Sequence, residues 1–130
     1  MKKLTVVARW VAGTIFVVMG INGFIEFIPL ADKSPEGAAF LQALGRTGYF
    51  WPFEKGCEIL FGALLLFNRW VVLAIEGLAP IIVNIILFHL FLDLPGIPLA
   101  LVVLTCEIIL VIGYWKVHFG HYLKTIRLAP

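Results

Sequence analysis

The chain has 130 residues, of which 62% are hydrophobic and only 14% are charged, and its formal net charge is +2. A soluble domain has about half apolar and about a quarter charged residues, so much of this chain must meet lipid rather than water. The charge is small and no basic cluster is interleaved with aromatic residues, which excludes nucleic acid as a partner. We therefore expect one integral membrane domain, residues 1–130, whose main partner is the lipid bilayer.

Four apolar segments are predicted to be membrane-spanning helices, at about residues 4–28, 49–67, 70–92 and 99–114. A span needs about 20 residues. Lysines precede the first segment, as in a signal peptide, but Pro29 follows its apolar run without a small-residue cleavage site, so we expect the segment to be retained. Asn68 and Arg69 predict a tight turn between the second and third segments. Proline and glycine in residues 93–98 predict another turn before the fourth.

A short amphipathic helix is predicted between the first two spans, at about residues 35–45. Ser34 is a good N-cap and Pro35 is suited to the first helical turn. The alternation of apolar and polar residues that follows is typical of a helix lying at the membrane interface. The predicted fold class is therefore all-α, a four-transmembrane-helix antiparallel bundle with this interfacial helix between spans 1 and 2.

Basic residues predict the orientation of this bundle. Four spans place both termini on one side, together with the lysines and arginines near the N-terminus, Arg69 and a tail at residues 115–130. That tail contains Lys116, His118, His121, Lys124 and Arg127. Because this side has more lysine and arginine than the other, the positive-inside rule predicts that both termini are cytoplasmic.

Polar side chains occur in the outer half of every predicted span, away from the termini. A charged group in hydrocarbon is costly unless it faces protein or water, so these residues predict a polar pocket that binds a ligand or relays protons. The candidates are Asn22, Glu26, Lys55, Glu58, Asn84, His89 and Glu107. Asn84 and His89 are five residues apart, about 140° around an ideal helix. Both face the interior only if the helix deforms, and Pro80 is a natural point for a kink.

The same residues allow plainer interpretations. Glu26 lies near enough to the interface to be solvated, and the two asparagines could bond neighbouring helices. A carboxylate or carbonyl close by could satisfy His89. Cys57 and Cys106 form no CxxC pair, so we expect buried apolar thiols, with a redox-active pair across two helices as the alternative.

Known catalytic and metal-binding motifs do not occur in the sequence. Carboxylate-bridged metal bundles use paired Glu-x-x-His motifs, which this chain lacks, so no metal site is predicted. No nucleotide-binding or hydrolase motif is present either. The chain therefore has no self-contained catalytic motif, and whether it is an enzyme stays open.

Four stretches of the chain resemble the small DoxX-like membrane proteins, within the broader DoxX family of four-helix integral membrane proteins. They are NGFIEFIP (Asn22–Pro29), GAAFLQALGRTGYFWPFEKGCEILFGALLLFNRWV (Gly37–Val71), APIIVNIILFHLFLD (Ala79–Asp93) and GIPLALVVLTCEI (Gly96–Ile108). The resemblance implies a location in the bacterial inner (plasma) membrane. Some family members are linked to thiosulfate:quinone oxidoreductase, and others to membrane oxidoreductase complexes that handle thiols and oxidative stress.

The resemblance extends to most candidate site residues. Positions typical of these proteins are occupied by Lys55, Glu58, Asn84, His89 and Glu107. Glu26 departs from the pattern, which typically has histidine there, and Glu76 stands where an aliphatic residue is expected.

The leading functional hypothesis is a redox-associated subunit that binds a quinone or small polar ligand in the outer-half pocket. It would be at most a subunit of an oxidoreductase complex, acting as a homodimer or within a membrane redox complex. The alternatives are a proton-coupled transporter or permeation module, and a structural or assembly factor.

Overall fold

The computed structural model describes residues 1–116, and the regular structure in that range is helical. In chain order it consists of α1 (Lys2–Ile25), α2 (Pro35–Gly45), α3 (Phe50–Leu66), α4 (Val71–Phe91), a short 3₁₀ turn η1 (Leu94–Gly96) and α5 (Ile97–Tyr114). The all-α prediction is confirmed, and α2 occupies the range expected for the interfacial helix. The histidines and basic residues predicted for the tail beyond Lys116 lie outside the described residues.

Three helical segments within residues 1–116 are long and apolar enough to cross a membrane: α1, α4, and Leu94–Tyr114, which joins η1 to α5. The predicted second span is also a helix, but α3 has only 17 residues and contains Glu54, Lys55 and Glu58. At 1.5 Å per residue it is about 25 Å long, whereas the hydrocarbon core of a bilayer is about 30 Å thick. The fourth crossing therefore stays a prediction.

Short-range side-chain bonds set the ends of α1 and α2. The Ser34 hydroxyl accepts a hydrogen bond of 3.0 Å from the Gly37 amide, which confirms the predicted N-cap of α2. In α1, the Asn22 carboxamide accepts from the Ile28 amide at 2.6 Å and donates to the Ile28 carbonyl at 3.2 Å. Glu26 adopts a left-handed conformation with φ of 49°. These bonds turn the chain out of the helix, so α1 ends at Ile25 rather than near residue 28.

The predicted turn between α3 and α4 is confirmed, with Asn68 and Trp70 both at positive φ. Arg9 of α1 reaches this end of α3 and donates to the Leu65 carbonyl at 3.1 Å. Arg9 is buried, with 9% of its surface exposed. Because carbonyls at a helix C-terminus favour a nearby cation, this bond ties α1 to the end of α3.

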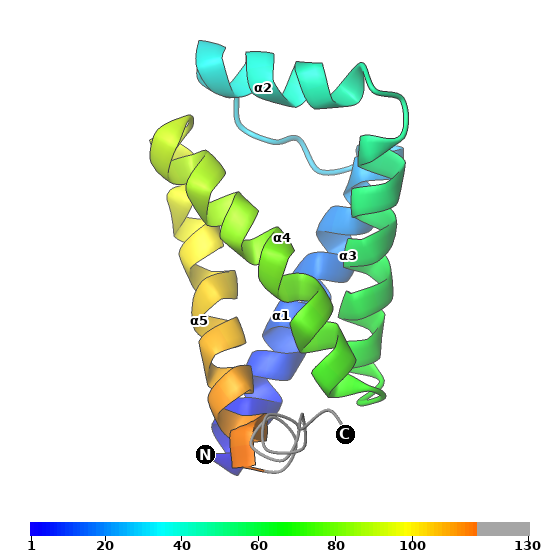
Figure 1. The fold of residues 1–130 in the computed structure, drawn as a ribbon, viewed down its shortest axis with the longest axis vertical. Helices are drawn as coiled ribbons and strands as arrows, with labels where there is room; N and C mark the ends of the chain where they lie inside the picture. The colour runs from blue at the N-terminus through cyan, green and yellow to red at the C-terminus, as the bar shows by residue number, and fades with distance from the viewer. Residues whose placement is uncertain (117–130) are drawn as a thin grey trace, which may run out of the picture.

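The four long helices form two pairs, α1 with α3 and α4 with α5, which converge at one end and diverge at the other (Figure 1). Within the first pair the backbones nearly touch, since a Cβ added at Gly13 would lie 3.0 Å from the Gly62 carbonyl oxygen. The pairs meet where Thr5 lies against Gly113 and the Phe61 ring lies against Gly77. The buried apolar core is concentrated toward this converging end and includes Ala8, Ala12, Leu65, Ala74, Ile75, Leu78 and Leu110.

Helix α2 lies across the diverging ends of the two pairs (Figure 1). Phe40 of α2 contacts Phe88 of α4, with ring centroids 5.9 Å apart. At the other end of α2, a Cβ on Gly45 would come within 3.2 Å of the Trp51 indole nitrogen of α3. The helix therefore bridges both pairs above the space that they leave between them.

Asn22 is predicted to stabilise the fold through its two bonds to Ile28. Replacing Asn22 with alanine leaves both backbone groups of Ile28 without these partners, and we expect a loss of about 1–3 kcal/mol in unfolding free energy. Thermal or denaturant unfolding in detergent measures it. Thr14→Ala, an exposed change on the same helix, should alter stability by less than about 0.5 kcal/mol. Equal stability of the two variants would contradict the assignment.

Candidate functional site

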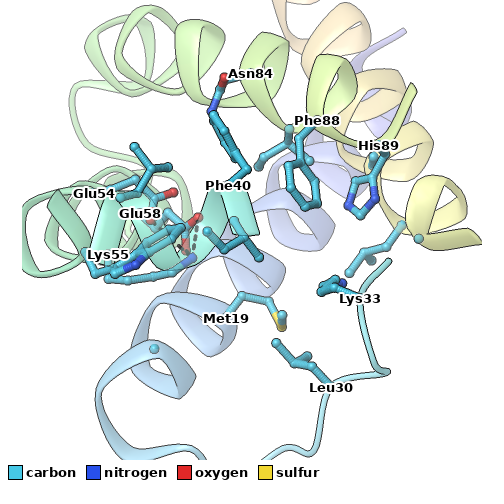
Figure 2. A pocket seen from close by; sticks show the side chains of 18 of the residues that line it. Met19, Leu30, Lys33, Phe40, Glu54, Lys55, Glu58, Asn84, Phe88 and His89 are labelled. Carbon is cyan, nitrogen blue, oxygen red and sulfur yellow. Dashed lines mark hydrogen bonds and ion pairs between the residues drawn. The ribbon is translucent and has the colours of Figure 1, made fainter. Parts of the chain in front are cut away.

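A cavity of about 740 Å³ lies between the two helix pairs beneath α2 (Figure 2). Its lining is mainly apolar and aromatic, with Phe16 and Met19 from α1, Phe40 from α2, Trp51 from α3 and Phe88 from α4. A volume of this size, with a few polar groups in an apolar lining, is typical of small-molecule and cofactor sites. The half of the bundle nearest α2 therefore contains a cavity rather than a packed core.

One wall of the cavity carries two carboxylates held by one lysine. The Lys55 ammonium lies 3.1 Å from each carboxylate oxygen of Glu58 and 3.2 Å from Glu54 Oε2. Glu58 is only 3% exposed. The aliphatic stem of Lys55 lies against Gly23 of α1, where an added Cβ would approach it to 2.6 Å. Because buried carboxylates are costly without a partner, Lys55 makes the burial of Glu58 feasible.

The opposite wall carries His89 and Lys33. Lys33 belongs to a group next to the cavity that we call the Asp93 latch, which consists of Lys33, Ser34, Leu92 and Asp93. Asp93 Oδ1 accepts a hydrogen bond of 3.1 Å from the Ser34 amide, and Oδ2 lies 3.4 Å from the Lys33 ammonium. The Ser34 hydroxyl donates to the Leu92 carbonyl. The hydrogen bond from Ser34 and the charge of Lys33 hold the pKa of Asp93 below its ordinary value of 3.8. The latch therefore fixes the start of α2 to the end of α4.

His89 belongs to both the latch and the cavity. Its Nδ1 lies 3.0 Å from the backbone carbonyl of Asp93 and 3.5 Å from Oδ2 of the same residue. A carbonyl oxygen can only accept, so Nδ1 must carry a proton, and in the neutral ring Nε2 is then an acceptor. The ring lies so close to Gly96 that no Cβ fits there.

Five of the seven predicted site residues line this cavity: Glu26, Lys55, Glu58, Asn84 and His89. Figure 2 shows the glutamates and Lys55 on one side and His89 with Lys33 on the other. Asn84 and Glu26 are exposed residues of the lining. Asn84 and His89 line the same cavity despite their spacing, and Pro80 lies within their helix.

Asn22 and Glu107 do not line the cavity. Both polar atoms of the Asn22 carboxamide bond Ile28, so its contacts are neither with a ligand site nor with a neighbouring helix. Glu107 is 6% exposed, and neither of its oxygens has a hydrogen-bond partner within residues 1–116. It follows Val103, a lining residue, by one helical turn, so it lies on the same face of α5 beneath the cavity. Cys57 and Cys106 are free thiols.

Sequence reasoning missed the residues that attach α2, the helix that covers the cavity, to the rest of the bundle. Lys33 and Ser34 lie in a polar loop, and their partner Asp93 is about 60 positions later in the chain. The only sequence signal was the spacing of four residues between His89 and Asp93, which puts both on one helix face. Glu54 and Trp51 line the cavity as well, one turn before Glu58 and Lys55.

No family model, curated protein or solved structure matches the chain.

The Asp93 latch is predicted to hold the start of α2 against the end of α4 at neutral pH and to release it in acid. Because folding lowers the pKa of Asp93, the carboxylate stabilises the latch above its ordinary pKa of 3.8, and this stabilisation is lost as the pH falls through the lower folded value. Asp93→Ala should therefore speed amide hydrogen exchange across residues 29–45 at neutral pH. Asp32→Ala, an exposed change in the same loop, should leave exchange unaltered. Identical exchange in the two variants would show that the latch does not hold α2.

Proposed function

We propose that this chain is a DoxX-like integral membrane protein with four spans, which binds a quinone in the cavity beneath α2 as a redox-associated subunit. The observation that carries the proposal is a single cavity with an aromatic lining and with Lys55 and His89 on opposite walls. A quinone has a flat apolar ring with an oxygen at each end. Aromatic side chains suit the ring, and the two walls suit the oxygens.

The polar side chains on the two walls of the cavity suit a ligand that gains and loses protons. Lys55 has three N–H donors, of which two bond Glu58, and the third, which faces Glu54 at 3.2 Å, suits a quinone carbonyl. Neutral His89, with its proton on Nδ1, offers an acceptor at Nε2, which suits the hydroxyl of a quinol. Glu58, bonded to Lys55, is a second group that can hold a proton at the other end of the ligand. The chain's own residues would bind the ring, orient it and exchange its protons, as general acids and bases do.

The arrangement of charge supports α3 as the fourth crossing. Lys55 and Glu58 of α3 line the cavity rather than standing alone on the outside of the bundle, so their charge does not bar α3 from the bilayer. With α3 included, α2 lies at the outer interface and both termini are cytoplasmic, in accord with the distribution of lysine and arginine. The inner membrane of a bacterium is the proposed location.

Electron transfer to or from a bound quinone needs a second redox component, so we propose that the chain works within a membrane redox complex or as a homodimer in contact with one. Exposed apolar residues are abundant on every long helix, for example Leu60, Leu73 and Ile108. Such surfaces can meet lipid or a partner helix alike.

Quinone retention by the purified protein tests the proposal. We expect about one quinone per chain in nanodiscs by organic extraction and mass spectrometry. In His89→Leu, binding should weaken about tenfold, because loss of one polar anchor costs about 1–1.5 kcal/mol. Glu76→Gln, an exposed change on the same helix, should retain quinone. Absence of quinone from the wild-type protein would contradict the proposal and favour a structural or assembly factor.

One observation favours proton-coupled transport as a second candidate function. Glu107 is a buried carboxyl without a hydrogen-bond partner among the described residues, and it lies one turn beneath the cavity. Isolated carboxyls at membrane depth occur in the proton relays of pumps and transporters. In liposomes that contain a pH-sensitive dye, this candidate predicts proton flux in the wild type that Glu107→Gln abolishes and Glu76→Gln preserves. Equal fluxes in the wild-type and Glu107→Gln proteins would exclude it.

A further inference from the structure

We infer that the cavity takes an amphiphile from the bilayer, with its polar head between Lys55 and His89 and its apolar tail leaving sideways between α1 and α5. This inference rests on the cavity in which the proposed function places a quinone, and it adds the route of access and the need for a tail. The tail is defined by its chemistry, a flexible hydrocarbon or isoprenoid chain.

The residues of α1 and α5 that line the cavity are apolar, while Glu26 and Lys33 line it from the segment that follows α1. Ile15 and Met19 come from α1, and Leu99, Ala100 and Val103 come from α5. Leu99 lines the cavity and has 47% of its surface exposed. Asn84 and Glu26 are exposed lining residues too, but Leu99 is apolar, so an opening beside it suits lipid. An opening with such a lining exposes no polar group to hydrocarbon and can face lipid without cost.

The divergence of the helix pairs produces this opening. Thr5 and Gly113 bring α1 and α5 together at the converging end of the bundle. Met19 and Leu99 belong to the opposite end, where Figure 1 shows the two helices apart. Leu99 is the third residue of α5, so the opening lies in the half of the bilayer nearest α2.

The remaining sides of the cavity suit a polar head rather than a tail. On α3 and α4 the lining includes Glu54, Lys55 and Asn84. Above the cavity, α2 is held at one end by the Asp93 latch and in its middle by the contact of Phe40 with Phe88. The apolar side is therefore the one through which a hydrocarbon chain can leave without desolvating charge.

A pair of ligands with one head and different tails tests the inference. The probes are tail-free dimethoxy-methyl-benzoquinone and its decyl derivative, titrated into the full chain in nanodiscs. Leu99→Trp should fill the opening, so it should weaken binding of the decyl compound by about tenfold or more while leaving the tail-free compound unchanged. Leu101→Trp is the matched control, an equally exposed position on α5 that does not line the cavity, and both compounds should bind it as they bind the wild type.

Comparison within one nanodisc composition removes the effect of membrane partitioning, which is the same for every variant. Retained binding of the tail-free compound in Leu99→Trp shows that the variant is folded. Unchanged decyl binding in Leu99→Trp would overturn the inference, as would an equal loss of both compounds. Failure of the wild type to bind either compound would instead overturn the proposed quinone site.

Discussion

The structure depends on the burial of Glu58 beside Lys55 within a bundle of apolar helices. A carboxylate that is 3% exposed needs a nearby cation. Lys55, three residues earlier on α3, provides that cation, and the fit of α3 against α1 leaves room for the lysine side chain. Glycine on α1 makes the room, since Gly20 lies at the Lys55 carbonyl and Gly23 at the lysine stem. Glu58 and Lys55 therefore join α3 to α1 and at the same time form a polar wall of the cavity between the two helix pairs.

The two ends of the bundle consequently differ in construction. Toward the converging end Leu65, Leu78 and Leu110 form a close-packed core, while at the other end the helix pairs are joined through α2 and its polar attachments. A packed core has one arrangement and resists deformation. Helix α2, which is held by a few hydrogen bonds, one ion pair and ring contacts, can move away from the bundle at smaller cost than the packed end can open.

The sequence predicted the helices well because apolar runs, caps and turn residues are local signals. It misplaced the end of α1, where the side chain of Asn22 turns the chain earlier than hydropathy suggests. Depth along each predicted span selected seven polar residues, five of which line the cavity, but it gave no direction around the helix axis. Asn22 and Glu107 have suitable depth yet lie off the cavity, and the latch joins Ser34 to Asp93 across 59 positions, a distance that periodicity does not reveal.

His89 links the cavity to the attachment of α2. One ring nitrogen is bound to the backbone carbonyl of Asp93, whose carboxylate also holds Lys33 and Ser34, while the ring itself lines the cavity. The same ring packs edge-on against Phe88, which contacts Phe40 of α2. Two routes, one polar and one aromatic, therefore connect this side chain to α2, so a movement of the His89 ring cannot leave α2 unaffected.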